Sequence, residues 1–391
     1  MISPGAWLGL LGGGQLGRMF TMAAQSMGYK VLVLDPGEHS PAGSVADGHI
    51  AADYLDNAAL SEMAGRCAAA TTEFENVPAE SLRRLAVSSV VSPSADSVSI
   101  AQDRIREKIF LRDSGLAVAP FAVVRAEADL AVPEVDALLP GVLKVSRFGY
   151  DGKGQVRVAE RAELATAFAR LNHEPCVLER LLKLDRELSV IVARGFDGRV
   201  VTWPVAENCH ANGILDLSVV PAQVSAELAQ SARRAAIQLA EKLDYRGVLC
   251  VEFFVLADGA LLVNEIAPRP HNSGHYTIDA CLTSQFEQQV RVLCSLPLGD
   301  TAMHCPAVMV NLLGDLWAAG EPRWERALRH PGVKLHLYGK SEARRGRKMG
   351  HFTVLDHSVE KALALAGEIK SLLVADAAST RADSPRAARN G

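Results

Sequence analysis

The sequence predicts a mixed fold, in which an α/β region is followed by an α+β region. Near the N-terminus, short apolar runs at 7–11 and 31–34 are separated by a helix-like apolar pattern at 16–24. Short apolar runs next to glycine are typical of buried parallel strands joined by a crossover helix. Later in the chain, Asp258 and Gly259 separate two longer apolar runs, which indicates an antiparallel hairpin. Parallel and antiparallel patterns thus occupy different parts of the chain.

The remaining elements are predicted in chain order. A charged, helix-like segment at 101–111 places a domain boundary near residue 103. A long amphipathic pattern at 225–243 predicts a helix that packs on the second region. A shorter helix is predicted at 162–171, and the other strands are predicted at 88–91, 142–145, 176–179, 188–192, 248–256, 260–266, 307–312 and 334–338.

Length and composition exclude several classes of protein. The chain has 391 residues and a mass of 41.8 kDa, enough for two to three domains. Its net charge is −4, from 41 basic and 45 acidic residues, so nucleic acid is not an expected partner. No apolar run reaches the roughly 18 residues of a membrane span. Seven cysteines without a CxxC pair indicate reduced thiols and a cytoplasmic protein.

A glycine-rich loop follows the first predicted strand. Gly12, Gly14 and Gly17 have the GxGxxG spacing, and Asp35 stands 18 residues after Gly17. This is the spacing of a dinucleotide-binding fingerprint, in which glycines let backbone amides approach an anion at a helix N-terminus. The residues alone leave three interpretations open: a nicotinamide cofactor, another phosphorylated ligand, or a structural turn without a ligand.

A second glycine-rich segment, at 147–155, has basic residues on both sides. Lys144 ends a predicted strand, and Arg147 and Lys153 accompany three glycines within six residues. The segment lacks the GxxxxGK[ST] pattern of a P-loop. Its strand-like flanks indicate a hairpin lid that folds over phosphates. The alternative is an ordinary turn with solvated charges.

Two glutamates are predicted to face each other on the hairpin. If the turn has two residues, Ala257 pairs with Ala260 and, by the same count, Glu252 pairs with Glu265. Buried like charges are costly unless a cation neutralises them. Mg²⁺ prefers oxygen ligands and is usually shared with substrate phosphates, and Asn264 offers another oxygen. The alternative is a solvated pair, and a one-residue slip would place the two on opposite faces.

Two more polar segments follow. The loop 267–275 directly follows the carboxylate strand and contains Arg269, His271 and His275. Proline and glycine break any helix there, so a zinc site is not expected, and the histidines are either structural or in contact with substrate. The segment 344–351 places four basic residues within five positions. It is either a solvated turn or a phosphate anchor.

Taken together, these residues resemble the ATP-grasp superfamily and, within it, the 5-(carboxyamino)imidazole ribonucleotide synthase family of purine biosynthesis. The resemblance covers about residues 7–365, and its specificity comes from the order and spacing of motifs that are weak singly. The motifs NEIAPRPHNSGH and GRKMGH separate this family from other ATP-grasp enzymes such as biotin carboxylase. The motifs are GGGQLGRM (12–19), TTEFENVP (71–78), FGYDGKGQ (148–155), NEIAPRPHNSGHYT (264–277) and GRKMGH (346–351).

The resemblance implies three structural parts and a tail. A Rossmann-like domain at 1–103 precedes an ATP-grasp core at 104–300, in which a mobile lid subdomain covers about 117–190. A small β-rich element at 301–375 completes the pocket, and residues 376–391 form a disordered tail. A homodimer is also implied.

The resemblance further implies a reaction and its ligands. ATP, bicarbonate and 5-aminoimidazole ribonucleotide would give the N-carboxylated product, ADP and phosphate through carboxyphosphate. Carried over by position, the Mg²⁺ ligands are Glu252 and Glu265, and the catalytic residues are Asp151, Lys153, Arg269 and His271. The ATP-binding residues are Arg104, Lys144, Gly149, Tyr150, Asp151, Gly152, Lys153, Gly154, Gln155, Glu179, Arg180, Leu181, Leu182, Glu187, His210, Asn264 and Glu265. The substrate-binding residues are Gly14, Gln15, Leu16, Glu73, Asn76, Tyr150, Arg269, His271, Asn272, Arg347 and Lys348.

Two other functional classes make different predictions. An NAD-dependent dehydrogenase would use the first glycine loop and Asp35, but it leaves the paired carboxylates and the second loop without a role. A non-catalytic nucleotide-binding module would keep Lys144 but would not need two metal carboxylates. Release of ADP that depends on aminoimidazole ribonucleotide separates the ligase from both.

Overall fold

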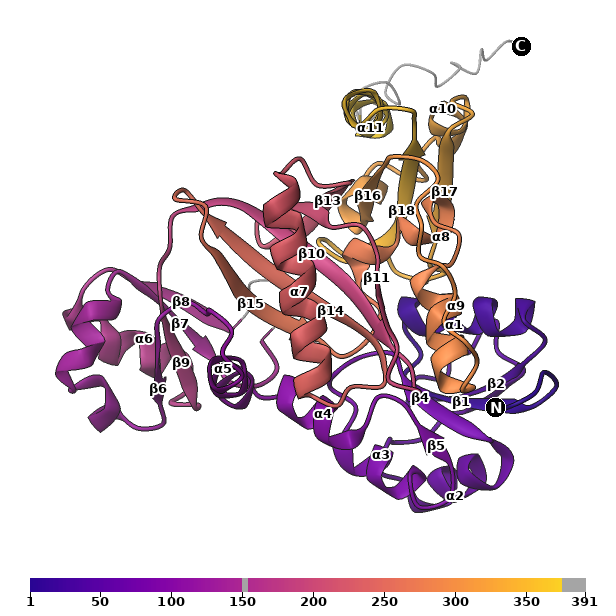
Figure 1. Ribbon diagram of the computed structural model, residues 1–391, viewed down its shortest axis with the longest axis horizontal. Coiled ribbons are helices and arrows are strands. Elements are labelled where there is room, and N and C mark those ends of the chain that lie inside the picture. Colours follow the sequence, from indigo (N-terminus) through magenta and orange to yellow (C-terminus); the bar gives the residue numbers. More distant parts are fainter. Residues whose placement is uncertain (150–153, 375–391) are drawn as a thin grey trace, which may run out of the picture.

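The computed structural model describes residues 1–149 and 154–374 (Figure 1). The predictions for Tyr150, Asp151, Gly152 and Lys153, and for the tail at 376–391, lie outside the described residues. The described chain forms three sheets, of five, nine and four strands. This mixed architecture confirms the predicted fold class.

The N-terminal part is a parallel sheet with the Rossmann-like strand order β3-β2-β1-β4-β5. The strands β1 and β2 are buried along nearly their whole length, as their continuous apolar runs predict. The strands are β1 (Trp7–Leu11), β2 (Lys30–Leu34), β3 (Gly48–Ile50), β4 (Ala69–Thr72) and β5 (Val90–Val91), and the helices are α1 (Gln15–Ser26), α2 (Asn57–Arg66), α3 (Ala79–Leu85) and α4 (Ala95–Ala101).

The segment predicted as one helix at 101–111 is divided, so that prediction was wrong in detail. The helix α4 ends at Ala101, and α5 (Arg104–Asp113) begins after Asp103. The Asp103 carboxylate accepts hydrogen bonds from the amides of Ile105 and Arg106, which satisfies the first turn of the new helix.

A four-stranded sheet with the order β6-β9-β7-β8 forms the part drawn at the left of Figure 1. It has a core of its own, in which Leu143, Phe168 and Leu178 are fully buried. Lys144 on β7 pairs with Gln155 on β8, so the second glycine segment joins two antiparallel strands as predicted. The elements are β6 (Phe121–Val124), β7 (Gly141–Val145), β8 (Gln155–Val158), β9 (Cys176–Arg180) and α6 (Leu164–Arg170).

The nine-stranded sheet has the order β15-β14-β10-β12-β13-β16-β18-β17, with β11 paired to β10. The C-terminal β-rich part therefore continues the sheet of the core instead of forming a sheet of its own. The predicted long helix is α7 (Ala226–Lys242), whose Ala236 and Leu239 pack against Leu249 and Val251. The strands are β10 (Leu184–Arg194), β11 (Val200–Thr202), β12 (Ala206–Ala211), β13 (Ile214–Val220), β14 (Gly247–Leu256), β15 (Leu261–Ala267), β16 (Ala307–Leu313), β17 (Val333–Leu337) and β18 (Lys348–Leu355).

The register of the β14–β15 hairpin differs from the prediction near its turn. The Leu256 amide donates to the Ala260 carbonyl, so the predicted pair of Ala257 with Ala260 was wrong. A β-bulge farther along shifts the register by one residue, and Glu252 consequently pairs with Glu265. The predicted glutamate pair is thus confirmed, but it depends on a bulge that the sequence did not reveal.

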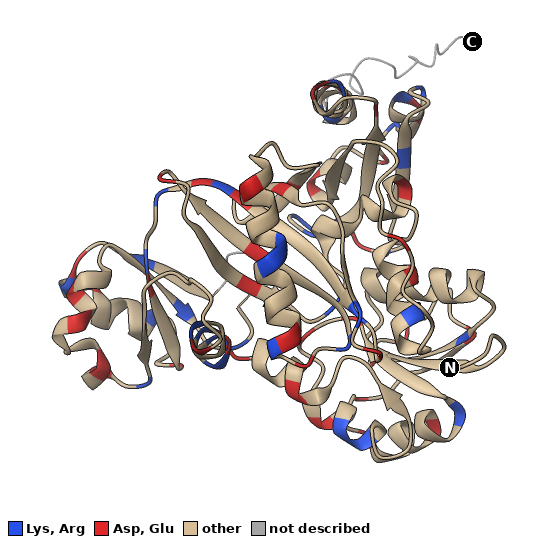
Figure 2. Cartoon of the chain, in the orientation of Figure 1, with Lys and Arg blue, Asp and Glu red and all other residues tan. Residues whose placement is uncertain are grey.

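The remaining helices join the parts of the molecule. Phe286 and Val290 share a buried cluster with Leu8 and Phe20 of the N-terminal domain. Basic and acidic residues are interspersed, for example along α7 (Figure 2). None of the helices within 1–149 and 154–374 has the length and apolar character that crossing a membrane requires. These helices are α8 (Thr277–Ala280), α9 (Gln285–Leu293), α10 (Trp324–Leu328) and α11 (Val359–Val374), with 3-10 turns at Glu127–Leu130, Pro133–Leu138, Arg161–Glu163, Asn272–Gly274 and Gly314–Trp317.

Candidate active site

A cavity of about 740 Å³ lies between the three sheets. Its walls come from the loop after β4, helix α5, the hairpin of β7 and β8, strands β14 and β15 with the loop after them, and the start of β18. Parts of the chain that are far apart in sequence therefore meet around one space, which is large enough for a nucleotide and a second small molecule.

Lys144, which lines the β7 side of this cavity, shares one buried carboxylate with the buried Lys108. Lys144 Nζ donates to Glu179 Oε2 at 2.9 Å, and Lys108 Nζ lies 3.5 Å from Glu179 Oε1. Burial opposes ionisation of Glu179, but Lys108, Lys144 and Arg104 lower its pKa below the usual value. Because two lysines share one glutamate, this side of the cavity retains positive charge for an anionic ligand.

Helix α5 places a mixed set of charges against strand β15. Arg104 Nη2 donates to Glu265 Oε2 at 3.2 Å. Glu107 is buried, and burial together with the negative charge of Glu265 raises its pKa to about 7, although Arg104 and Lys108 oppose the shift. Glu107 is therefore a carboxyl group that titrates near neutral pH beside the predicted metal ligands.

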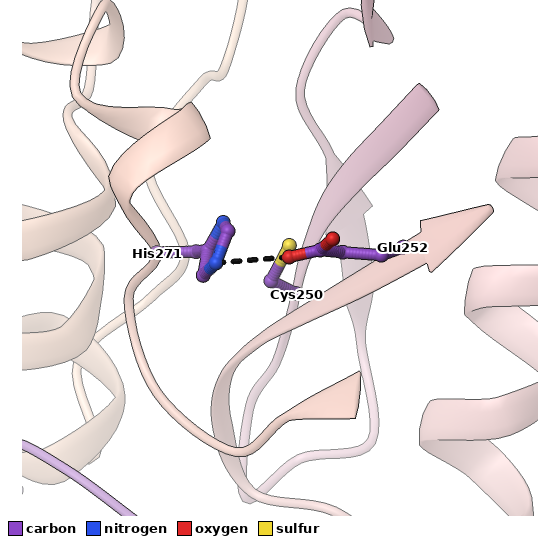
Figure 3. Close-up of side chains that lie close together, drawn as sticks. All are labelled: Cys250, Glu252 and His271. Carbon is purple, nitrogen blue, oxygen red and sulfur yellow. Dashed lines mark ion pairs between the residues drawn. The ribbon is translucent and has the colours of Figure 1, made fainter. Parts of the chain in front are cut away.

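His271 is held from both sides of its ring. Its Nε2 lies 3.0 Å from Glu252 Oε1 (Figure 3). Its Nδ1 lies 2.9 Å from Ser273 Oγ. The Ser273 amide, which can only donate, also points at Nδ1 at 3.3 Å. This contact makes Nδ1 an acceptor, so Nε2 carries a proton and donates a hydrogen bond to Glu252. Burial alone would raise the pKa of Glu252, but His271, with His210 and Lys348, lowers it to about 2.

Arg269 lies in the same loop and pairs with a carboxylate of the N-terminal domain. Its Nε donates to Glu75 Oε2 in a short ion pair, and its Nη1 donates to the Pro270 carbonyl. Burial opposes ionisation of Glu75, yet Arg269 lowers its pKa below the usual value. The pair connects the end of β15 to the loop after β4 across the cavity wall.

The donor set around Glu252 and Glu265 fits Mg²⁺. Both carboxylates line the cavity, and Asn264 Oδ1 beside them is buried without a hydrogen-bond partner. The neighbouring Cys250 thiol has a pKa well above its usual value because it is buried, so it stays protonated and is a poor ligand. A set of oxygen donors with one unsatisfied amide oxygen favours a hard cation.

The first glycine loop is filled by the chain itself. The Gly14 and Gly17 amides donate to the two oxygens of Glu73 at 2.6 and 2.9 Å, and the Gly13 amide donates to Asp35 at 2.8 Å. A Cβ atom at Gly14 would collide with the Glu73 carboxylate. The place where a dinucleotide-binding domain holds a pyrophosphate is thus occupied by a buried carboxylate.

The structure brings most of the predicted site residues together, but not all of them. Those that do not line the cavity are Gly14, Gln15, Leu16, Glu73, Glu179, Arg180, Leu181, Leu182 and Arg347, and Tyr150, Asp151, Gly152 and Lys153 lie outside the described residues. Those that line the cavity are Asn76, Arg104, Lys144, Gly149, Gly154, Gln155, Glu187, His210, Glu252, Asn264, Glu265, Arg269, His271, Asn272 and Lys348.

Three charged residues of the site were missed by sequence reasoning. Glu75 follows Glu73 by two positions in the same motif and was passed over for it. Glu107 and Lys108 follow Arg104 by three and four positions, so they lie on the same helix face. That spacing was the available signal, but a charged helix segment is ordinarily a solvated face.

Three domain families match the chain in order. The ribonucleotide synthetase preATP-grasp domain matches residues 6–102, the ATP-grasp domain matches residues 109–286, and the phosphoribosylaminoimidazole carboxylase C-terminal domain matches residues 307–365. These matches follow the succession of the parallel sheet, the core with its four-stranded sheet, and the β16–β18 region.

Curated proteins match along nearly the whole chain. The N5-carboxyaminoimidazole ribonucleotide synthase of Brucella melitensis biotype 1 is 47% identical over 355 residues, which cover 90% of this chain and 97% of the relative. The protein of the same name from Bacillus subtilis (strain 168) is 46% identical over 355 residues, covering 91% of this chain and 93% of the relative.

Solved structures of proteins with the same or a similar name also match this chain. The ADP complex of an N5-carboxyaminoimidazole ribonucleotide synthetase has a TM-score of 0.89 at 43% identity and covers 95% of this chain and 97% of its own. The N5-carboxyaminoimidazole synthase of Aspergillus clavatus, solved with ADP and 5-aminoimidazole ribonucleotide, has a TM-score of 0.85 at 31% identity, covering 94% and 98%. The chain, with its three matched domains in order, belongs to the N5-carboxyaminoimidazole ribonucleotide synthase family of ATP-grasp ligases.

Proposed function

We propose that this chain is an ATP-dependent carbon–nitrogen ligase that carboxylates 5-aminoimidazole ribonucleotide with bicarbonate. The observation that carries the proposal is one cavity, which joins a basic side with Arg104 and Lys144, two facing carboxylates and a side that holds Arg269 and His271. A relative solved in complex with both ADP and 5-aminoimidazole ribonucleotide supports the choice of these two ligands.

In the proposed reaction, a bicarbonate oxygen attacks the γ-phosphorus of ATP. The bond from that phosphorus to the β,γ-bridging oxygen breaks, which releases ADP and leaves carboxyphosphate. The 5-amino nitrogen of the ribonucleotide then attacks the carbonyl carbon of carboxyphosphate. The carbon–oxygen bond to phosphate breaks, and the departing phosphate takes up the proton that the nitrogen loses.

The residues of the β7 side would bind and orient the ATP phosphates. Lys144 and Arg104 line the cavity, and each is already paired with a carboxylate, Glu179 and Glu265. Fixed cations stabilise the charge that moves onto the leaving oxygen, and they cost no reorganisation during the reaction. Glu187 and His210 also line the cavity, and the Glu187 carboxylate lies 3.1 Å from His210.

The residues of the other side would hold bicarbonate and the ribonucleotide. The planar fork of Arg269 suits a bicarbonate or carboxyphosphate oxygen pair. His271 holds a proton at Nε2 and can give a hydrogen bond to the same anion. Asn272 and Lys348 line the cavity beside them. Asp151 and Lys153 remain proposed catalytic residues through the family resemblance.

Mg²⁺ is the proposed metal, held by Glu252 and Glu265 with Asn264 beside them. When bound, it would neutralise phosphate oxygens and orient the nucleotide.

The deciding experiment is a coupled assay of ADP release. We expect release that requires ATP, bicarbonate and Mg²⁺ and that increases strongly when 5-aminoimidazole ribonucleotide is added. Release that is independent of the ribonucleotide would contradict the proposal, and tight binding of NADH without ADP release would favour the dehydrogenase.

We further propose that the protein is a cytoplasmic homodimer. The cytoplasmic location is supported by the seven cysteines, which are all free thiols. The dimer is proposed from the family resemblance alone. Light scattering of the purified chain would test it, and a mass near 41.8 kDa would contradict it.

A further inference from the structure

We propose that Glu107 and Lys108 are positioning residues, which hold the β-bulge of β15 and thereby keep Glu265 on the same face of the sheet as Glu252. The inference rests on the proposed function, because it takes these two glutamates as the Mg²⁺ ligands. Neither Glu107 nor Lys108 is among the residues that the sequence motifs assign to the site.

The bulge is what brings the two glutamates face to face. Continued without it, the pairing near the turn would set Glu252 opposite Asn264 and would place Glu265 opposite Val251, on the other face of the sheet. With the bulge, Asn264 and Glu265 both stand opposite Glu252. Three oxygen-bearing side chains consequently line one wall of the cavity.

Helix α5 bonds to the backbone on both sides of Glu265. Lys108 Nζ donates to the Asn264 carbonyl at 2.8 Å, and Glu107 Oε1 accepts from the Ile266 amide at 2.7 Å. A bulge disrupts the strand ladder locally, so the backbone there depends on partners from elsewhere. Lys108 is fully buried and Glu107 is 3% exposed, which makes both bonds costly to lose.

The helix that provides these bonds is itself anchored to the four-stranded sheet. The Arg104 amide donates to the Ser146 carbonyl at 2.8 Å, and Ser146 Oγ donates to the N-cap residue Asp103 at 2.6 Å. Lys108 also lies 3.5 Å from Glu179, the partner of Lys144. The same helix thus fixes strand β15, which carries the proposed metal ligand Glu265, relative to Lys144, the proposed phosphate-binding lysine.

Two conservative variants of Glu107 separate position from charge. Glu107→Gln keeps the side-chain length and the acceptor oxygen but removes the charge. Glu107→Asp keeps the charge but withdraws the carboxylate from the Ile266 amide by one methylene. A positioning role predicts that the Asp variant is impaired and the Gln variant is not, whereas an electrostatic role predicts the reverse.

The readout is Mn²⁺ binding to the full chain in the presence of ADP, measured by electron paramagnetic resonance without turnover. We expect Glu107→Asp and Lys108→Met to weaken Mn²⁺ binding about tenfold or more, the usual effect of losing a residue that orients a metal ligand. Glu107→Gln should stay within about threefold of the unmodified chain. Arg112→Met is the matched control, because Arg112 lies on the same helix but is exposed.

The steady-state kinetics of ADP release should distinguish the same variants. The Mg²⁺ concentration for half-maximal ADP release should rise in the Asp and Met variants, while the Michaelis constant for the ribonucleotide stays within about twofold. Weak Mn²⁺ binding by Glu107→Gln together with unchanged binding by Glu107→Asp would overturn the inference. Unchanged binding by all the variants would overturn it as well. If Lys108→Met does not fold, the comparison of the two Glu107 variants still decides it.

The same experiment separates failure of this inference from failure of the proposed function. Mn²⁺ binding with ADP is measured without the ribonucleotide, so a chain that does not carboxylate it still gives a result for Glu107. Absence of Mn²⁺ binding in the unmodified chain would refute the metal site itself, and this inference with it.

Discussion

The two glycine-rich loops of this chain differ in what lies against them. At the first loop, the Gly14 and Gly17 amides are satisfied by Glu73, a carboxylate of the chain itself. At the second, Gly149 and Gly154 border an open cavity together with Lys144. Backbone amides at a helix N-terminus favour an anion, but they do not specify whether that anion is a ligand or a side chain.

This difference divides the charged residues of the molecule into two groups. The carboxyl group in the filled first loop is part of the folded structure as a hydrogen-bond acceptor, so its removal should cost stability. A charge that lines the cavity should instead be needed for ligands, so its removal should cost activity and leave stability nearly unchanged. The variants below test this division.

Removing Glu73 should have the largest effect, and it should act on folding. Glu73→Ala leaves the amides of the half-buried Gly14 and the buried Gly17 without acceptors, at about 1–3 kcal/mol for each. We expect a loss of about 3–5 kcal/mol in the free energy of unfolding, measured by urea denaturation. Glu80→Ala is the matched control, because Glu80 forms exposed ion pairs in the same domain and should change stability by less than about 1 kcal/mol. Equal stability of Glu73→Ala and the unmodified chain would show that Glu73 is not needed to fill the loop.

Sequence reasoning could predict the cavity better than the filled loop. The apolar runs and the Asp258–Gly259 turn signal were enough to place β14 and β15 side by side. The motif at 71–78 did not reveal which of its two glutamates faces the cavity. That choice depends on how the chain leaves β4: Glu73 turns toward the glycine loop and Glu75 toward Arg269.

The bulge of β15 and the contacts of Lys108 could not be predicted from the sequence for a related reason. A bulge adds one residue to one strand without changing the apolar pattern around it. The predicted count was wrong by one residue at the turn, and it reached the Glu252–Glu265 pair because the bulge offset that error. Lys108 lies in a charged helix segment that is typical of solvated faces, yet it is fully buried against Glu179. Its role depends on contacts with residues that are distant in the sequence.

Changing a cavity carboxylate should act on turnover instead of folding. Glu265→Gln removes one of two facing negative charges, so the metal-free chain should melt at the same temperature or slightly higher. The rate of ADP release should fall about 10²–10³-fold, the usual effect of losing one preorganised electrostatic contact, with partial recovery at high Mg²⁺. Early melting with an unchanged rate would place Glu265 with Glu73 as a structural charge.

Glu107 should make the free energy of unfolding of the chain depend on pH. Its pKa in the folded chain is raised to about 7 from 4.5, so the folded state binds the proton more tightly than the unfolded state. The stability that this proton contributes is present below about pH 4.5 and is lost as the pH rises through about 7. Glu107→Gln removes that loss, so the metal-free variant should be more stable by about 3 kcal/mol at pH 8. The two chains should melt together near pH 4.5, and a difference that does not change with pH would contradict this origin.

Lys144→Ala should weaken ATP binding while the fold survives. Its partner Glu179 keeps a second cation, Lys108, so no buried carboxylate is left without compensation. Loss of a charged hydrogen bond to phosphate costs about 1.5–3 kcal/mol, which corresponds to roughly 10–100-fold in the dissociation constant. Calorimetric titration with ATP measures it, and an unchanged constant would remove Lys144 from the nucleotide side.

The smallest effect concerns the basic turn before β18, where the structure separates two neighbouring cations. Lys348 lines the cavity, whereas Arg347 does not line it and donates to the Glu342 carbonyl at 3.0 Å. We therefore expect Lys348→Ala to raise the Michaelis constant for the ribonucleotide about tenfold, or roughly 1.4 kcal/mol. Arg347→Ala should stay within about twofold, which reverses the order that arginine's better fork for phosphate would suggest. Varying each substrate separately distinguishes the two sides of the cavity: if the constant for ATP rises and the constant for the ribonucleotide does not, Lys348 serves the nucleotide.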